Sequence, residues 1–266
     1  MCVLLLCCQI SGTEVVYAAV KLNGTTAIIT GSASPLGAAI ALKLAEAGCS
    51  CVCHYHHSRA DCIQLTEQIR RLGAGAIAVG GDLTEEQTVE KIFEQAEQIG
   101  TVRILINSAS VFERTPLMEI TSEKIERIFR LNFTAPVLMS RSFFSGLKQV
   151  PREKGSVSGK IINIADVAAV RAWAQYCPYC SSRGALVTAT KSLAKELAPG
   201  ICVNAVAPGL ITWPAEFDES EKKRQLSLIP MRRIGNLSEV TAVILFLLEN
   251  DYITGQLINI DGGRCI

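Results

Sequence analysis

Short apolar, β-branched runs alternate with longer amphipathic stretches along most of the chain. The runs predict seven strands, near residues 25–30, 49–55, 76–80, 102–107, 160–165, 201–207 and 256–261. The longer stretches predict helices near residues 36–47, 59–72, 84–99, 121–147, 177–198 and 237–249. Runs that are apolar on both faces and joined by helix-length crossovers are typical of a parallel sheet covered on both sides. We therefore expect an α/β fold with a single-domain, doubly wound, seven-stranded parallel sheet.

Length and composition agree with this expectation. The 266 residues suffice for one α/β domain, which we place at 21–266, after an irregular N-terminal extension over 1–20. Hydrophobic residues make up 49% of the chain, and the net charge is +1, so neither disorder nor a nucleic-acid partner is indicated. The apolar run in "MCVLLLCCQI" is too short to span a membrane. We expect no membrane partner.

The eleven cysteines are odd in number and irregularly spaced, unlike the disulfide framework of a small secreted protein. This pattern favours a reducing compartment, and we expect a cytoplasmic protein. A lipid anchor on Cys2, Cys7 or Cys8 is the alternative, but no second membrane signal accompanies these residues.

The segment "CSCVCHYHHSR" (49–59) holds all three histidines and three cysteines, which raises the question of a metal site. On a strand, alternate side chains point to opposite faces, so Cys51 and Cys53 face away from His54 and His56. The side chains therefore cannot converge on the four-ligand tetrahedron that zinc requires. We expect no metal site.

The turn "TGSASPLG" (30–37) follows the first predicted strand. In doubly wound folds this turn carries the phosphate site of a bound nucleotide. Gly31 and Gly37 allow a tight turn, and a helix beginning near Leu36 offers free N–H groups to a pyrophosphate. Two glycines are weak evidence alone, and an ordinary turn between a strand and a helix is the alternative.

Further motifs follow at characteristic spacings: "INSAS" (106–110), Asn132, "IINIAD" (161–166), "YCSSR" (179–183), "NAVAPGL" (204–210) and "ITGQLINIDGG" (253–263). Together they resemble the short-chain dehydrogenase/reductase family, over about residues 22–263. The resemblance implies a Rossmann-type domain, a nicotinamide cofactor and the homotetrameric state usual in the family.

One branch of the family, the pteridine reductases, is the most similar. Most members have Ser thirteen residues before the catalytic Tyr, whereas Asp166 stands at that distance before Tyr179, as in pteridine reductases. "CHYHHSR", "SASVFERTPL" (108–117) and "PGLITWP" (208–214) also resemble this branch. A pterin must gain a proton on a ring nitrogen beside the carbon that receives hydride, and a carboxyl beside a Tyr hydroxyl can relay that proton.

The resemblance implies a role for each matching position. The implied catalytic residues are Asp166, Tyr179, Arg183 and Asn132. The implied cofactor-binding residues are Gly31, Ser34, Leu36, Gly37, His56, His57, Ser58, Arg59, Asp82, Leu83, Asn107, Ser108, Ala109, Tyr179, Arg183, Pro208, Gly209 and Leu210. The implied substrate-binding residues are Ser110, Phe112, Asp166, Tyr179 and Trp213, with Phe112 stacking on the pterin and Trp213 closing over it.

The end of the second predicted strand favours NADPH over NADH. An NAD enzyme usually presents an acid there to the ribose 2′-OH, whereas this chain offers His56, His57, Ser58 and Arg59 to a 2′-phosphate. We predict an NADPH-dependent reductase that transfers hydride to a pterin such as a dihydropteridine or dihydrofolate.

Two positions depart from the family pattern. Pro35 replaces the middle glycine of TGxxxGxG, and Arg183 replaces the lysine of YxxxK. Pro suits a first helical position, and Arg keeps the charge near Tyr179 but is not interchangeable with Lys. Two alternatives therefore stay open: a carbonyl reductase or alcohol dehydrogenase of the same family, and a catalytically weakened dinucleotide-binding protein.

Overall fold

The computed structural model describes residues 21–148, 156–214 and 217–266. The N-terminal extension expected over 1–20 lies outside the described residues. Seven parallel strands form one sheet in the order β3-β2-β1-β4-β5-β6-β7. They are β1 (Thr26–Ile29), β2 (Ser50–Tyr55), β3 (Ala76–Gly80), β4 (Val102–Asn107), β5 (Gly159–Ile164), β6 (Ile201–Pro208) and β7 (Leu257–Ile260). The predicted doubly wound fold is confirmed.

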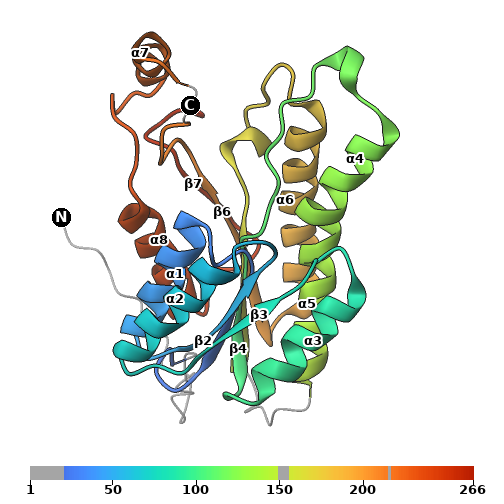
Figure 1. Ribbon diagram of the computed structural model, residues 1–266, viewed down its shortest axis with the longest axis vertical. Helices are drawn as coiled ribbons and strands as arrows, with labels where there is room; N and C mark the ends of the chain where they lie inside the picture. The colour runs from blue at the N-terminus through green and yellow to red at the C-terminus, as the bar shows by residue number, and fades with distance from the viewer. Residues whose placement is uncertain (1–20, 149–155, 215–216) are drawn as a thin grey trace, which may run out of the picture.

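The helices form a layer on each face of the sheet (Figure 1). One layer contains α1 (Pro35–Glu46), α2 (Arg59–Arg71) and α8 (Leu237–Glu249). The other contains α3 (Glu86–Glu97), α4 (Ser122–Phe129), α5 (Ala135–Leu147) and α6 (Cys177–Leu197). A further helix, α7 (Glu219–Ser227), lies at the top of the molecule in this view, away from both layers.

Two hydrophobic cores lie between the sheet and these layers. Alternation along β2 divides its side chains between them: Cys51 and Cys53 pack with α1, α2 and α8, and Val52 packs with α3 and α5. Cys49, Cys51 and Cys53 are therefore fully buried core residues on one face of the sheet.

The helix predicted over 121–147 is confirmed in extent, because the chain is helical at every residue from Ser122 to Leu147. Its one unpredicted feature is a π-helical turn at Arg130–Thr134, between α4 and α5. The helix α7 was not predicted, because none of its residues is buried and it therefore lacks an apolar stripe.

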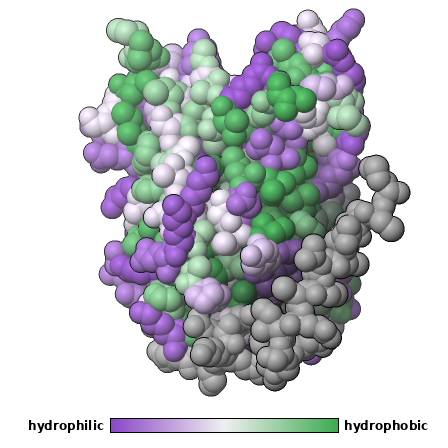
Figure 2. Space-filling view, turned by 180° about the vertical axis from the view of Figure 1, so that it is seen from behind, coloured by the Kyte–Doolittle hydropathy of each residue, from purple (hydrophilic) through white to green (hydrophobic). Residues whose placement is uncertain are grey.

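The surface is notched at the top when the molecule is seen from behind, and hydrophobic residues are visible in the notch (Figure 2). No helix among the described residues is long and apolar enough to cross a membrane.

Candidate active site

The turn after β1 is shaped by two glycines. Gly31 has φ +64°, and a Cβ atom there would lie 2.8 Å from the Cα of Ala109. A Cβ at Gly37 would lie 2.4 Å from the carbonyl oxygen of Gly31. The turn ends at Ser34, whose Oγ accepts a 3.1 Å hydrogen bond from the Gly37 N–H and so caps α1. Pro35 is the first residue of α1, so this departure from the family pattern leaves the turn intact.

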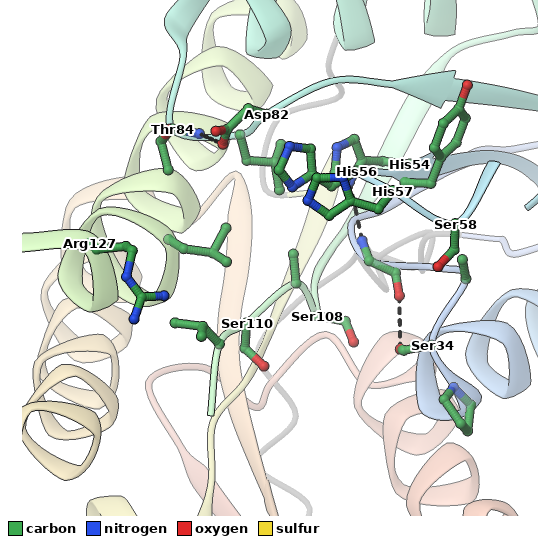
Figure 3. A pocket seen from close by; sticks show the side chains of 18 residues that line it. Ser34, His54, His56, His57, Ser58, Asp82, Thr84, Ser108, Ser110 and Arg127 are labelled. Atoms are coloured by element: carbon green, nitrogen blue, oxygen red, sulfur yellow. Dashed lines mark hydrogen bonds between the residues drawn. The ribbon is translucent and has the colours of Figure 1, made fainter. Parts of the chain in front are cut away.

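A cavity of about 840 Å³ opens at this turn, beyond the carboxyl ends of β1 to β4 (Figure 3). It brings together ten of the residues that the sequence implied, from four separate segments. They are Gly31, Ser34, His56, His57, Ser58, Asp82, Leu83, Ser108, Ala109 and Ser110. Pro35, His54, Tyr55, Thr84, Val111, Arg127 and Leu131 also line it, along with Ala33.

The other implied cofactor residues do not line this cavity. They are Leu36, Gly37, Arg59, Asn107, Tyr179, Arg183, Pro208, Gly209 and Leu210. The amide of Asn107 is buried and donates a 2.8 Å hydrogen bond to Oδ1 of Asn163 on the neighbouring strand β5. The Asn107 side chain therefore points toward β5 and not into the cavity. Arg59 is the exposed first residue of α2.

His54 is a further residue of the cavity, to which sequence reasoning gave no role. Its Nδ1 accepts a 3.3 Å hydrogen bond from the Gly31 N–H, so Nε2 carries the ring proton and donates to the Gly81 carbonyl at 3.0 Å. The side chain is 2% exposed, and burial lowers the pKa of His54 to about 4. Neutral His54 thus ties the glycine turn to the end of β3.

A carboxyl and a phenol lie in direct contact where β5 meets α6. The Tyr179 hydroxyl donates a 2.7 Å hydrogen bond to Oδ2 of Asp166, and Oδ1 of Asp166 accepts one from the Ala168 N–H at 2.7 Å. Burial raises the pKa of the Asp166 carboxyl. Burial also raises the pKa of the Tyr179 hydroxyl, which the charge of Arg183 opposes. Each group therefore holds its proton more tightly than it would in water.

Arg183 lies one turn of α6 beyond Tyr179. Its guanidinium carbon is 5.2 Å from the centroid of the Tyr179 ring, and Nη1 donates to the Ile164 carbonyl at 3.2 Å. Nε of Arg183 is buried and has no hydrogen-bond partner within the described part of the chain. A buried guanidinium N–H with no partner is costly, so a ligand that accepts a hydrogen bond there would be stabilising.

Asn132 lies in the π-helical turn, and its amide holds the strand-to-loop segment after β4. Oδ1 accepts from the Val111 N–H at 2.8 Å, and Nδ2 donates to the Val111 carbonyl at 2.9 Å. Nδ2 also lies 3.1 Å from the Ser182 hydroxyl on α6. Asn132 therefore links the cavity wall to the helix that carries Tyr179.

Phe112 belongs to an aromatic cluster around Tyr179. It stacks on Tyr176 with ring centroids 5.0 Å apart and meets Tyr179 edge-on at 4.9 Å. The ring centroids of Trp173 and Phe112 lie 6.2 Å apart, in an edge-on arrangement. Phe112 is 55% exposed, so it is not a core residue. Sequence reasoning missed Trp173 and Tyr176, although aromatic residues just before the "YCSSR" motif could have suggested them.

Trp213, the aromatic residue expected to close over the substrate, lies on the loop after β6. Its ring packs 6.4 Å from that of Phe217. Neither residue belongs to the cluster around Tyr179 or lines the large cavity. No group of three or more potential metal ligands occurs within 21–148, 156–214 and 217–266.

The chain matches known proteins over nearly its whole length. Residues 31–264 match the family model described as "Enoyl-(Acyl carrier protein) reductase". Sorbitol dehydrogenase from Cereibacter sphaeroides is 31% identical, over 92% of this chain and 98% of the relative. Galactitol 2-dehydrogenase from Agrobacterium fabrum is 30% identical, also over 92% of this chain and 98% of the relative.

A solved structure from Agrobacterium tumefaciens, with a suggested gluconate dehydrogenase activity, superposes with a TM-score of 0.84. It is 30% identical and covers 92% of this chain and 97% of its own. The chain therefore belongs to the short-chain dehydrogenase/reductase family of oxidoreductases, which use nicotinamide dinucleotide cofactors.

The described residues fit such a cofactor. The glycines let the turn pack closely against Ala109 and against the start of α1. This packing fixes the N-terminus of α1 at the cavity, where a helix N-terminus can bind a phosphate. The cavity extends from this turn to the ends of β3 and β4. The unpartnered Nε of Arg183 offers a donor beside Tyr179.

Proposed function

We propose that the protein is an NADPH-dependent reductase in which Tyr179 and Asp166 handle the proton. The observation that carries this proposal is the 2.7 Å hydrogen bond from the Tyr179 hydroxyl to Asp166, one turn before the buried cation of Arg183. Bound NADPH would supply the hydride. The chain's own residues supply the proton and the orientation of the substrate.

The proton path follows from the hydrogen bonds. Tyr179 donates its proton to the substrate atom next to the carbon that is reduced, and Arg183 stabilises the tyrosinate that remains. Asp166 can then take up a proton from solvent and pass it to the tyrosinate, and burial favours this uptake because it raises the pKa of the Asp166 carboxyl. The reverse sequence serves oxidation of an alcohol.

The cofactor preference rests on the end of β2. His56, His57 and Ser58 line the cavity there, and none of these side chains is an acid that would repel a 2′-phosphate. The rings of His56 and His57 lie 3.6 Å apart, which gathers imidazole donors at one place. Arg59 is exposed at the adjacent helix start, where its long side chain can reach a phosphate.

An alcohol and its carbonyl form the first candidate substrate pair, and the relatives favour it over a pterin. Two of them are named for sugar alcohols and the solved structure for gluconate. Arg264 adds support, because its charge acts on Asp166, and its buried Nη1 has no hydrogen-bond partner in the described chain. Such a donor suits a substrate rich in hydroxyl or carboxylate oxygens.

A pterin is the second candidate, and the aromatic cluster favours it. Phe112 is half-exposed and already lies near Tyr176 and Trp173, so a flat bicyclic ring would find stacking partners beside Tyr179. Asp166 in place of the more common Ser also suits protonation of a ring nitrogen.

The two candidates separate in one experiment. NADPH oxidation is measured with ketoses, simple ketones, dihydrobiopterin and dihydrofolate, and NADP⁺ reduction with sorbitol, galactitol and gluconate. Turnover confined to the polyol or carbonyl set supports the first candidate, and turnover confined to the pterins supports the second. Absence of turnover with every substrate would contradict the proposed activity and favour the weakened dinucleotide-binding protein.

We also propose the homotetramer usual in the family. Phe246 on α8 is 56% exposed and Tyr252, just before β7, is fully exposed, which leaves apolar surface beside the edge strand β7. Light scattering coupled to gel filtration would give the mass directly, and a monomer mass would contradict this assignment.

A further inference from the structure

In the sequence "CPYC" (177–180), at the start of α6, one cysteine precedes Tyr179 and one follows it. Cys177 is the first residue of the helix and is exposed. Cys180 follows one turn later and is 7% exposed. A Cys-X-X-Cys pair at a helix N-terminus, with one accessible and one buried sulfur, is the arrangement found in reactive dithiols.

The helix geometry brings the two residues within reach of a disulfide. Residues i and i+3 lie on the same face of an α-helix, and their Cα atoms are about 5 Å apart from the rise and radius of the helix. Disulfides span Cα separations of roughly 4.4–6.8 Å. The Cys180 N–H donates a 2.8 Å hydrogen bond to the Tyr176 carbonyl, so the helical spacing is already present at the first turn that holds the pair.

The surroundings of the two sulfurs differ. Cys180 packs with Ala168, Tyr179, Trp173 and Tyr176, and its Sγ accepts a 3.5 Å hydrogen bond from the Trp173 N–H. Burial raises the pKa of the Cys180 thiol, and the nearby charge of Asp166 raises it further. The exposed Cys177 is therefore the sulfur that a soluble reagent can reach first.

We propose that Cys177 and Cys180 form a dithiol site that exchanges with low-molecular-weight disulfides of the oxidised-glutathione class. The Cys177 thiolate attacks one sulfur of the small disulfide, whose S–S bond breaks and releases one thiol. The Cys180 thiolate then attacks the sulfur of Cys177 and releases the second thiol. The protein loses two electrons and two protons, and the small disulfide is reduced to two thiols.

The closed disulfide would disturb the substrate side of the active site. It would draw Cys180 Sγ away from the Trp173 N–H and tighten the turn that carries Tyr179. Gln175, which lies between Trp173 and Tyr179 in the chain, has φ +70°. Its carbonyl accepts a 2.6 Å hydrogen bond from the Thr115 N–H. This backbone has little freedom to absorb a shift. We expect oxidation to lower turnover while NADPH binding persists, a consequence that rests on the proposed function.

The dithiol site is tested by mass spectrometry on the full chain, which does not depend on turnover. The protein is equilibrated with reduced and oxidised glutathione at several ratios, free thiols are alkylated, and peptides are mapped. We expect a Cys177–Cys180 linked peptide, detected by the loss of both thiol hydrogens, to accumulate as the oxidised fraction rises. Cys180→Ser should instead stop at a glutathione adduct on Cys177, and Cys177→Ser should leave Cys180 reduced.

Cys265→Ser is the matched control, because Cys265 is also partly accessible but has no cysteine one turn away. It should form the Cys177–Cys180 bond as wild type does. Both cysteines remaining alkylatable in oxidised glutathione, or a stable adduct on Cys177 in wild type, would overturn the proposal.

The effect on the active site has its own readout. Linked wild type should lose at least about tenfold in turnover and regain it with dithiothreitol, whereas Cys177→Ser should be unaffected by oxidised glutathione. Full turnover of the linked form would overturn the regulatory consequence. Absence of turnover in every redox state would count against the proposed function. The peptide map would still show whether Cys177 and Cys180 form a disulfide.

Discussion

The Tyr179 hydroxyl donates a 2.7 Å hydrogen bond to the Asp166 carboxyl, whose other oxygen is held by the Ala168 N–H. A carboxyl that accepts hydrogen bonds from two donors has one orientation, so a proton has a defined path between the phenol and the carboxyl. This relationship distinguishes the site from one built on a serine, which has no comparable acidity.

Replacing the carboxyl tests its role in proton transfer. Asp166→Asn keeps the shape but removes the titratable group, so turnover should fall by about 10²–10⁴-fold while the Kd for NADPH stays unchanged. The readouts are steady-state kinetics and NADPH fluorescence titration. Equal turnover in Asp166→Asn and wild type would show that Asp166 only orients Tyr179.

Asp166→Ser separates the two substrate candidates. Ser can still accept a hydrogen bond from Tyr179 and donate one to a carbonyl oxygen, so reduction of a ketone should survive within about tenfold. Reduction of a pterin, which needs an acid for its ring nitrogen, should fall far more. The measurement is kcat/KM for both substrate classes in the same preparation. Equal losses would argue against an acid role specific to pterins.

The charge of Arg183 should be necessary. Its guanidinium lies 5.2 Å from the Tyr179 ring and opposes the rise in the phenol pKa, so Arg183→Ala should cost roughly 1–4 kcal/mol in the barrier to turnover. Arg183→Lys is the matched control and should retain or improve activity. Turnover that appears only in Arg183→Lys would instead favour the weakened dinucleotide-binding protein.

Phe112 should affect the substrate and not the cofactor. Phe112→Ala removes a half-exposed ring that contacts Tyr176 and Tyr179, so KM for a flat substrate should rise several-fold while the Kd for NADPH is unchanged. For a sugar alcohol the effect should be smaller. A matching loss in NADPH affinity would show that the ring supports the cavity instead.

His54 should make stability depend on pH. Burial lowers the pKa of His54 in the folded protein to about 4, below the ordinary histidine value of 6.5, so between these values the unfolded chain binds a proton that the folded chain does not. Stability should therefore fall as pH drops from about 6.5 toward 4, by up to about 3 kcal/mol from this group alone. Urea unfolding across this range should show a flatter profile for His54→Gln. If the free energy of unfolding changed with pH in the same way for wild type and His54→Gln, His54 would not be the cause of the pH dependence.

Local patterns predicted the strands and most helices because a buried parallel strand must be apolar on both faces. They did not predict the π-helical turn at Arg130–Thr134, where Oδ1 of Asn132 accepts a hydrogen bond from the N–H of Val111, 21 residues earlier in the chain. The same holds for Trp173 and Tyr176, whose partner Phe112 lies on another loop. The glycine turn could be predicted because its constraint is local.

The central claim is that Tyr179 transfers the proton in a nicotinamide-dependent reaction. The most direct measurement compares wild type with Tyr179→Phe in two assays, NADPH binding and turnover with the best substrate of the panel. The account predicts a loss of turnover of at least about 10²-fold in Tyr179→Phe, far larger than any loss of NADPH affinity from the missing hydroxyl. Turnover of Tyr179→Phe equal to that of wild type would contradict it.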